Sequence, residues 1–305
     1  MTVSPAEAVD AANAAFGRHP GSRALHAKGL LCRGTFTATP EAAALTTASH
    51  MQGDPVPVTF RLSNGGGNPG APDFAPDLRG LAAKLYLADG SRTDLVLVNL
   101  AQFASSTPEV FVALMQAQGA GAAAAVKLPL LMARNPSLLR ALPRAAWAMR
   151  PPTSYAAVRY YSQHAFRWID PTGTVRHVRY RAVPSVDEAA LSPLAARRRG
   201  RDYLQDELRE RLSREPVRFS LEVQIATPGD PVNDASAAWP EQRQRVVVGR
   251  FEIDGLELER ETGGDVVIFD PTRVTPGIEC SDDPVLLFRS PAYRESVARR
   301  APETR

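Results

Sequence analysis

Our interpretation of the sequence depends on residues 276–293, which read PGIECSDDPVLLFRSPAY. Arg289 and Tyr293 are four residues apart in a segment that we expect to be helical, so their side chains share one face. A guanidinium held against a phenol favours the phenolate, because an opposite charge stabilises the ionised form. A tyrosinate supported in this way is suited to binding haem iron. A surface helix with a half-buried tyrosine is the alternative, and the rest of the chain must decide between the two.

Length and composition are those of a globular protein. The chain has 305 residues, of which 44% are hydrophobic and 23% charged, which is enough to bury a sizeable core. A net charge of +3 with scattered basic residues argues against nucleic acid as the main partner. Two cysteines, Cys32 and Cys280, are too few for a disulfide framework, so we expect reduced thiols and a cytoplasmic location.

We predict no signal peptide, because residues 1–16 have neither a basic segment nor an apolar one. The most apolar tract, residues 111–149, has no uninterrupted run long enough to cross a bilayer. We predict two buried or interfacial helices there, broken at Pro129, Pro136 and Pro143. Association of this tract with a membrane surface is a less favoured alternative.

The order of predicted elements indicates an α+β fold. Residues 188–212 are charged and helical, and most of the remaining pattern alternates apolar and polar residues between turn-forming ones. We predict one antiparallel sheet closed into a barrel and wrapped by helices, a single domain over residues 1–305 with loose tails at 1–15 and 301–305. The predicted strands are residues 31–38, 56–63, 80–87, 93–98, 160–169, 174–181, 217–227 and 245–253.

A second candidate centre is the segment that contains Arg23 and His26. A neutral imidazole near a haem iron can take a proton from a peroxide and return it to the departing oxygen. An arginine three residues earlier is suited to a charge-assisted contact with a haem propionate. Taken alone, His26 is equally explained as a histidine of the core or the surface.

Three further residues fit such a centre. Ser63 can fix the tautomer of His26 through a hydrogen bond, and Phe103 and Phe111 can form the wall of an apolar pocket. Each is also explained by packing alone, because serine and phenylalanine are common in strands and cores.

Together these stretches resemble the haem catalase superfamily over residues 15–300, and the resemblance implies a catalase-type barrel with a proximal helix near the C-terminus. Because a long N-terminal arm and a C-terminal helical region are missing, the chain resembles the core-only branch called catalase-related peroxidases or minimal catalases. That branch implies haem, most simply haem b, a possible homodimer and no nicotinamide cofactor. The matching segments are RALHAKG at 23–29, FRLS at 60–63, DLRG at 77–80, VGRF at 248–251, FDPT at 269–272 and RSPAY at 289–293.

The resemblance also implies a role for each candidate residue. Tyr293 is the iron ligand and Arg289 supports it, while His26 acts as acid and base and is oriented by Ser63. The substrates are a peroxide and a small-molecule electron donor. The remaining haem-binding candidates are Arg23, Arg61, Phe103, Phe111 and Arg300, the last of which lies seven residues past Tyr293 on nearly the same helical face.

Two departures from the family pattern bear on activity. The family segment DLVGNNTPVF aligns with residues 94–103, so its first asparagine, the distal amide, falls on Val98. Asn99 is the remaining catalytic candidate, but neighbouring side chains on a strand point to opposite faces. We therefore expect weak oxygen release from hydrogen peroxide and better use of organic hydroperoxides. Pro291 is the second departure, because a proline there predicts that the helix is kinked or that its regular part begins at Pro291. In the second case the contact between Arg289 and Tyr293 needs a different geometry.

Three other functions stay open from the sequence alone. Some catalase-like proteins rearrange fatty-acid hydroperoxides, as allene oxide synthases do, and the apolar tract 111–149 suits a lipid substrate. A non-catalytic haem carrier or sensor is the second possibility. A haem-free barrel that binds another apolar ligand is the third.

Overall fold

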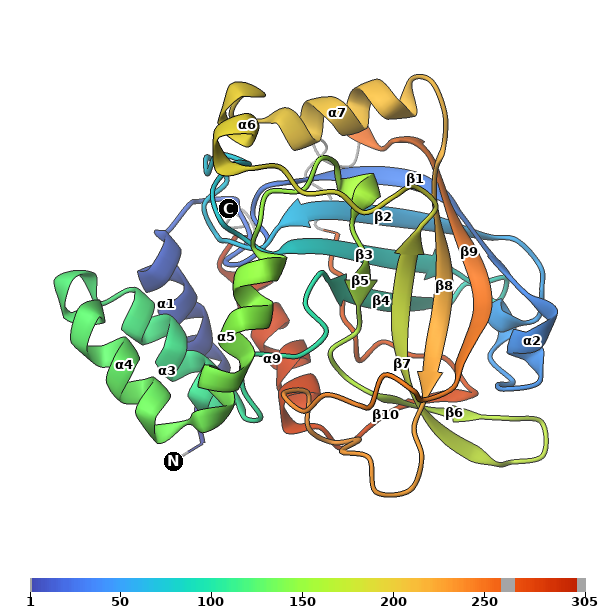
Figure 1. Ribbon diagram of the computed structural model, residues 1–305. Coiled ribbons are helices and arrows are strands. Elements are labelled where there is room, and N and C mark those ends of the chain that lie inside the picture. The colour runs from blue at the N-terminus through green and yellow to red at the C-terminus, as the bar shows by residue number, and fades with distance from the viewer. Residues whose placement is uncertain (1, 259–266, 301–305) are drawn as a thin grey trace, which may run out of the picture.

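The computed structural model describes residues 2–258 and 267–300, which are built around a closed antiparallel barrel (Figure 1). Its first four strands form a meander in which each pairs with the next. Strand β7 pairs with β5 and β8, and β9 pairs with β8 and β1, so eight strands close into a ring. These strands are β1 (Gly29–Ala38), β2 (Val56–Asn64), β3 (Arg79–Tyr86), β4 (Arg92–Val98), β5 (Tyr160–Tyr161), β7 (Val175–Pro184), β8 (Val217–Ile225) and β9 (Arg245–Leu256).

Aromatic side chains fill the barrel interior. Phe251 lies 5.2 Å from Phe36 and 5.3 Å from Phe60 between ring centroids, and all three are fully buried. Successive side chains on a strand point to opposite faces, so the positions between these core residues point out of the barrel. On β2 the outward positions include Arg61 and Ser63. The outer face of β1 to β4 is therefore where the predicted site must lie.

The N-terminal segment is a helix rather than the predicted loose tail. Helix α1 (Pro5–Phe16) begins at a capping box, in which Ser4 and Glu7 satisfy each other's backbone N–H groups. Its apolar face packs against α3 (Pro108–Gln118) and α9 (Pro284–Ala298). Packing in this cluster stabilises a segment that the sequence analysis assigned to a loose tail. The predicted tail at 301–305 lies outside the described residues.

The apolar tract 111–149 forms three α-helices in place of the predicted two. Pro129 lies inside α4 (Ala124–Arg134) and Pro143 inside α5 (Pro136–Ala148), so only Pro136 begins a helix. One proline removes one backbone donor and bends a helix, which the flanking turns tolerate here. Of the two predicted alternatives, buried or interfacial, the first does not hold for α4, none of whose residues is buried.

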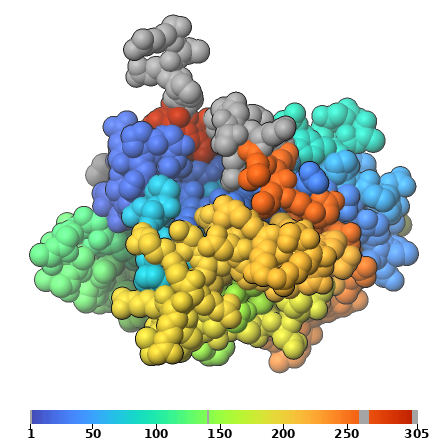
Figure 2. Space-filling view, turned by 90° about the horizontal axis from the view of Figure 1, so that it is seen from above, coloured from blue at the N-terminus to red at the C-terminus, as the bar shows by residue number. Residues whose placement is uncertain are grey.

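The remaining elements cover the ends of the barrel. Helices α6 (Pro193–Arg198) and α7 (Tyr203–Leu212) lie across its top, as Figures 1 and 2 show in yellow. Strands β6 (Phe166–Ile169) and β10 (Ile278–Cys280) extend the sheet beyond β7. The short elements are α2 (Pro40–Ala43), η1 (Ser49–Met51), η2 (Gly121–Ala123) and η3 (Tyr155–Ala157).

The predicted fold class is confirmed, and seven of the eight predicted strands are present with small shifts of their ends. The exception is 160–169, which contains two short strands, β5 and β6. Between them the Ser162 hydroxyl donates to the His164 carbonyl oxygen and accepts from the Tyr180 N–H. The Ser162 side chain makes hydrogen bonds that a neighbouring strand would otherwise make, and residues 162–165 lie outside the strands.

The buried histidine of η1 predicts how stability depends on pH. Burial lowers the pKa of His50 to about 4. The unfolded chain therefore binds a proton at His50 below about pH 6.5 that the folded chain does not, and stability falls as pH decreases toward 4. His50→Leu should flatten this decline by about 1.4 kcal/mol per pH unit in that window. Urea unfolding between these pH values measures the slope, and equal slopes in both proteins would refute the prediction.

Candidate active site

His26 lies against the outer face of β2 and β3, where the backbone leaves room for its ring. Its Nδ1 is 3.0 Å from the Ser63 Oγ. Gly80 pairs with Ser63 across the two strands. A Cβ at Gly80 would stand 2.8 Å from His26 Nδ1 and 2.9 Å from Ser63 Oγ, closer than real Cβ contacts. Only glycine at this position allows the imidazole to reach the serine.

A left-handed backbone turns the imidazole toward the strands. His26 has φ 54°, and it is the single non-glycine residue with positive φ in the described part of the chain. This uncommon conformation is held by two hydrogen bonds, from His26 N–H to the Gly65 carbonyl at 2.9 Å and from Ala27 N–H to the Gly66 carbonyl at 3.0 Å. Gly66 N–H in turn donates to Asp77 Oδ2 at 2.9 Å. The DLRG segment therefore positions the histidine indirectly.

The surroundings of His26 keep its imidazole neutral. Burial is the main cause that lowers its pKa to about 3, and the positive charges of Arg61, Arg289 and Arg23 add to it. A hydrogen bond with the backbone of Asn64 opposes the shift. At neutral pH the ring is therefore free of charge and able to accept a proton.

The predicted propionate-binding arginines differ in their contacts. Arg61 donates to the Ala27 carbonyl at 3.1 Å, and Arg23 donates to the Val267 carbonyl at 2.7 Å. The Nε atom of Arg300 is buried with no hydrogen-bond partner in residues 2–258 and 267–300, and burial lowers the pKa of this guanidinium. A buried donor without an acceptor favours an anionic group from outside the chain.

Arg289 and Tyr293 make the predicted contact despite the intervening proline. The guanidinium donates from Nε and Nη2 to the Tyr293 hydroxyl oxygen at 2.9 and 2.5 Å. Helix α9 continues through Pro291 without a break. The expected distortion at Pro291 leaves the contact intact, because the contact depends on two side chains one turn apart.

The structure adds a histidine and a carboxylate that the sequence analysis did not assign to the site. His164 Nδ1 lies 2.8 Å from Asp283 Oδ2, and both side chains are buried. Burial lowers the pKa of His164 to about 4, and the charge of Arg289 contributes to the shift while Asp283 opposes it. Asp283 also caps α9 by accepting from the N–H groups of Val285 and Leu286. Arg289 therefore acts electrostatically on both His26 and His164.

The two phenylalanines lie in contact with each other. The ring centroids of Phe103 and Phe111 are 5.0 Å apart, and the Phe103 ring is 6.1 Å from that of His164. Phe111 also packs in the cluster between α1, α3 and α9. Phe103 is thus brought to the His164 side of the site, and the role of both rings as a pocket wall stays a prediction.

Val98 occupies the position at which the family pattern has its distal asparagine. It pairs with Gly80 across β3 and β4, and directly paired residues point to the same face, so Val98 lies on the His26 side. Asn99 is not brought to His26. Its amide oxygen accepts from the Arg79 N–H at 2.7 Å, and its amide nitrogen donates to the Ala148 carbonyl at 2.6 Å. The structure thus uses Asn99 to fasten β3 to the end of α5.

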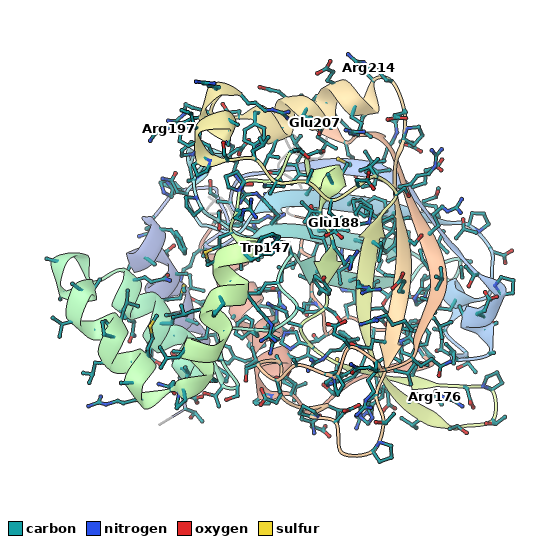
Figure 3. The ribbon with its side chains drawn as sticks, in the orientation of Figure 1. Trp147, Arg176, Glu188, Arg197, Glu207 and Arg214 are labelled. Carbon is teal, nitrogen blue, oxygen red and sulfur yellow. The ribbon has the colours of Figure 1, made fainter. Side chains whose placement is uncertain are left out.

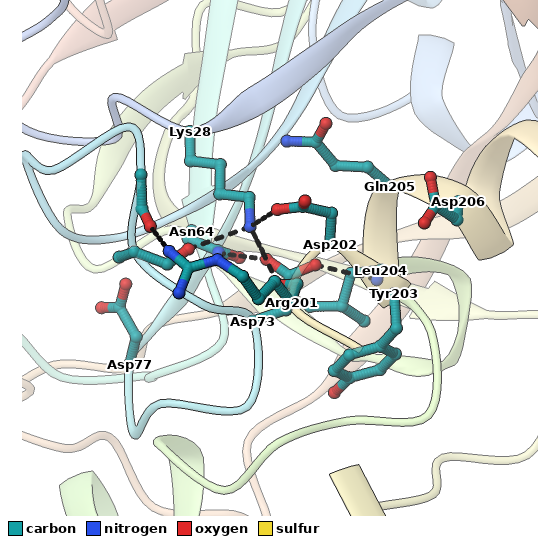
Figure 4. Close-up of polar contacts among 12 residues, drawn as sticks. Lys28, Asn64, Asp73, Asp77, Arg201, Asp202, Tyr203, Leu204, Gln205 and Asp206 are labelled. Atoms are coloured by element: carbon teal, nitrogen blue, oxygen red, sulfur yellow. Dashed lines mark hydrogen bonds and ion pairs between the residues drawn. The ribbon is translucent and has the colours of Figure 1, made fainter. Parts of the chain in front are cut away.

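A buried charge network holds the chain that follows His26 (Figure 4). Lys28 Nζ lies 2.7 Å from Asp73 Oδ1 and 2.6 Å from Asp202 Oδ1. Asp73 also accepts from Asn64 Nδ2 at 2.8 Å and from Leu204 N–H at 2.9 Å. This network connects the His26 and Ser63 segments to the start of α7.

The residues that surround His26 and Tyr293 fit an iron porphyrin with two carboxylates. Tyr293 offers an oxygen donor supported by a cation, and Arg23 and Arg61 place positive charge near His26 that would suit the carboxylates. The closed barrel, the neutral histidine on its outer face and the arginine-bound tyrosine are together typical of one class of protein, the haem-binding barrels.

Comparison with known proteins identifies the family. The family model described as Catalase matches residues 13–304, so the chain belongs to the catalase family. Members of this family generally bind haem. The chain is 49% identical over 298 residues to the catalase-related peroxidase of Mycolicibacterium paratuberculosis, covering 98% of this chain and 95% of that one. Identity to the catalase-related peroxidase of Synechococcus elongatus is 32%, covering 98% and 89%.

Longer catalases share the fold. The crystal structure of a fungal catalase superposes with a TM-score of 0.82 at 23% identity, and the match covers 93% of this chain but 61% of that one. The predicted family and its short, core-only branch are therefore confirmed, and the chain is a catalase-related oxidoreductase.

The network around Lys28 makes a prediction about stability. Lys28→Met leaves the fully buried Asp73 carboxylate without its cation, so the free energy of unfolding should fall by about 3 kcal/mol or more. The exposed Lys127→Met is the matched control and should change it by less than about 0.5 kcal/mol. Adding Asp73→Asn to Lys28→Met should restore part of the loss, because no unpaired charge is then buried. Urea unfolding tests all three, and equal stability of Lys28→Met and wild type would exclude the proposed role.

Proposed function

We propose that this protein is a haem peroxidase that reduces organic hydroperoxides and hydrogen peroxide with a small-molecule electron donor and releases oxygen only weakly. The observation that carries the proposal is that Arg289 contacts Tyr293 while its charge also acts on the neutral His26. The names of the two catalase-related peroxidases described above support the same activity.

Tyr293 and Arg289 hold the cofactor from one side. We assign the Tyr293 oxygen as the ligand that would bind the iron of haem b, and Arg289 orients that oxygen by donating two hydrogen bonds to it. His164 and Asp283 contact each other, and the charge of Arg289 acts on His164. Arg23, Arg61 and Arg300 bind the propionates. When bound, haem supplies the two electrons that cleave the O–O bond, and the donor later replaces them.

His26 moves the proton. Because Ser63 engages Nδ1, the other ring nitrogen, Nε2, faces the hydroperoxide and takes the proton from its terminal oxygen. The same nitrogen returns that proton to the departing oxygen, which leaves as an alcohol or as water. A pKa of about 3 leaves His26 neutral above about pH 4, so this step should not depend on pH between 5 and 8 through His26.

Two variants test this assignment on the haem-loaded protein. Tyr293→Phe should lose the high-spin absorption bands of a tyrosinate-ligated haem, whereas His26→Phe should keep them. His26→Phe should slow peroxide cleavage by about 10²- to 10⁴-fold in stopped-flow absorbance measurements. Tyr86→Phe, at the opposite end of β3 from Gly80, is the matched control and should resemble wild type in both. A wild-type protein that takes up no haem, or His26→Phe with full activity, would contradict the proposal.

The apolar side chain of Val98 predicts the balance between oxygen release and donor-dependent reduction of hydroperoxides. An apolar side chain beside His26 offers no donor to orient a second peroxide, so oxygen release should be slow compared with donor-dependent reduction of cumene hydroperoxide. Val98→Asn should raise oxygen release and leave cumene hydroperoxide turnover within a factor of about two. An oxygen electrode and a dye assay measure both rates. Fast oxygen release by wild type would refute this prediction, and a ketol formed from a fatty hydroperoxide without donor consumption would favour rearrangement.

A further inference from the structure

Helices α4 and α5 form a lobe that projects from the barrel beside α3 (Figure 1), and it protrudes at one edge of the molecule in Figure 2. We propose that this lobe binds the surface of a bilayer that contains anionic lipids. The inference goes beyond the peroxide chemistry and does not depend on it.

Helix α4 leaves an apolar stripe uncovered. Val126, Leu130 and Ala133 are exposed and recur at the spacing of one helical face, and Val126 is 71% exposed. Lys127 and Arg134 are exposed along one border of this stripe. A soluble protein ordinarily turns such a stripe toward its core, so its exposure indicates a partner surface.

Helix α5 repeats the arrangement. Leu139, Leu142 and Trp147 are exposed and share one face with Pro143, while Arg144 lies at the border of that face. Trp147 is 71% exposed. It lies at the C-terminal end of the helix, where Figure 3 labels it. Tryptophan at the edge of an apolar surface is favoured at the level of lipid headgroups, where one end of the ring is apolar and the other is wet.

The charge of the tract has one sign. No aspartate or glutamate occurs between Glu109 and Asp170. The guanidinium of Arg150 lies over the Trp147 ring, 4.4 Å from its centroid. On the adjoining α1, Glu7 is held in the capping box and Asp10 is ion-paired with Arg299. The basic residues of the tract are Lys127, Arg134, Arg140 and Arg144.

The apolar stripes of α4 and α5, bordered by basic side chains, indicate that the partner is an anionic membrane surface. Such helices lie in the plane of a membrane, with the apolar face among the headgroups and the cations on anionic lipids. No helix in residues 2–258 and 267–300 has the length and apolar character needed to cross a bilayer, so the contact is peripheral. A second copy of the chain would bring two basic faces together, and a nucleic acid would leave the leucines and Trp147 exposed to water.

Vesicle flotation of the haem-loaded protein tests the proposal. Wild type should float with phosphatidylcholine vesicles that contain phosphatidylglycerol and not with phosphatidylcholine alone. Binding should weaken on going from about 0.1 M to about 1 M salt, as the screening length falls from about 10 Å to about 3 Å. Lys127→Glu with Arg144→Glu should weaken binding more than about tenfold, because each basic residue near an anionic surface contributes and each new carboxylate is repelled.

A matched control separates this surface from net charge. Arg198→Glu with Arg250→Glu makes the same change in charge at exposed positions on α6 and β9, and it should bind as wild type does. Trp147→Ser should weaken binding at unchanged charge. Equal loss in both charge pairs, or no binding of wild type to anionic vesicles, would overturn the proposal. So would a dimer in light scattering that Trp147→Ser dissociates, since a second copy would then cover the face.

Discussion

The close approach of His26 to the outer wall of the barrel is the constraint on which the site depends. It requires a missing side chain at Gly80, a hydroxyl at Ser63 and an unusual backbone angle at His26 itself. Such a conformation is disfavoured alone and persists because the surrounding hydrogen bonds and the Lys28 network hold it. The barrel therefore supplies a rigid surface, and the loop before β1 supplies the chemical group.

Helix α9 brings the second half of the site to this surface. Asp283 both begins the helix and holds His164, so one carboxylate joins the start of the helix to the loop between β5 and β6. Arg289 then fixes the Tyr293 oxygen by two hydrogen bonds from a planar fork, a geometry that lysine cannot reproduce. The tyrosine is thereby oriented by a side chain one turn away on the same helix.

Much of the fold could be predicted from the sequence, because alternation marks strands and the Arg289–Tyr293 spacing holds in any helix. What could not be predicted depends on contacts between distant segments. His164 stands alone in the sequence, and its partner Asp283 lies 119 residues further on. Helix α1 did have a local signal in Ser4 and Glu7, which form its capping box. The predicted helix breaks at Pro129 and Pro143 were wrong, because each proline removes one backbone donor without ending its helix.

Electrostatics connects the two halves of the site. Arg23, Arg61 and Arg289 all lower the pKa of His26, so their positive charges act on one region, where they also repel one another. Arg300 adds a buried Nε without an acceptor in the described residues. A ligand that brings two carboxylates would relieve this repulsion, and it would stabilise the folded chain by binding it. Burial and these positive charges together keep His26 neutral, which is the state that proton transfer requires.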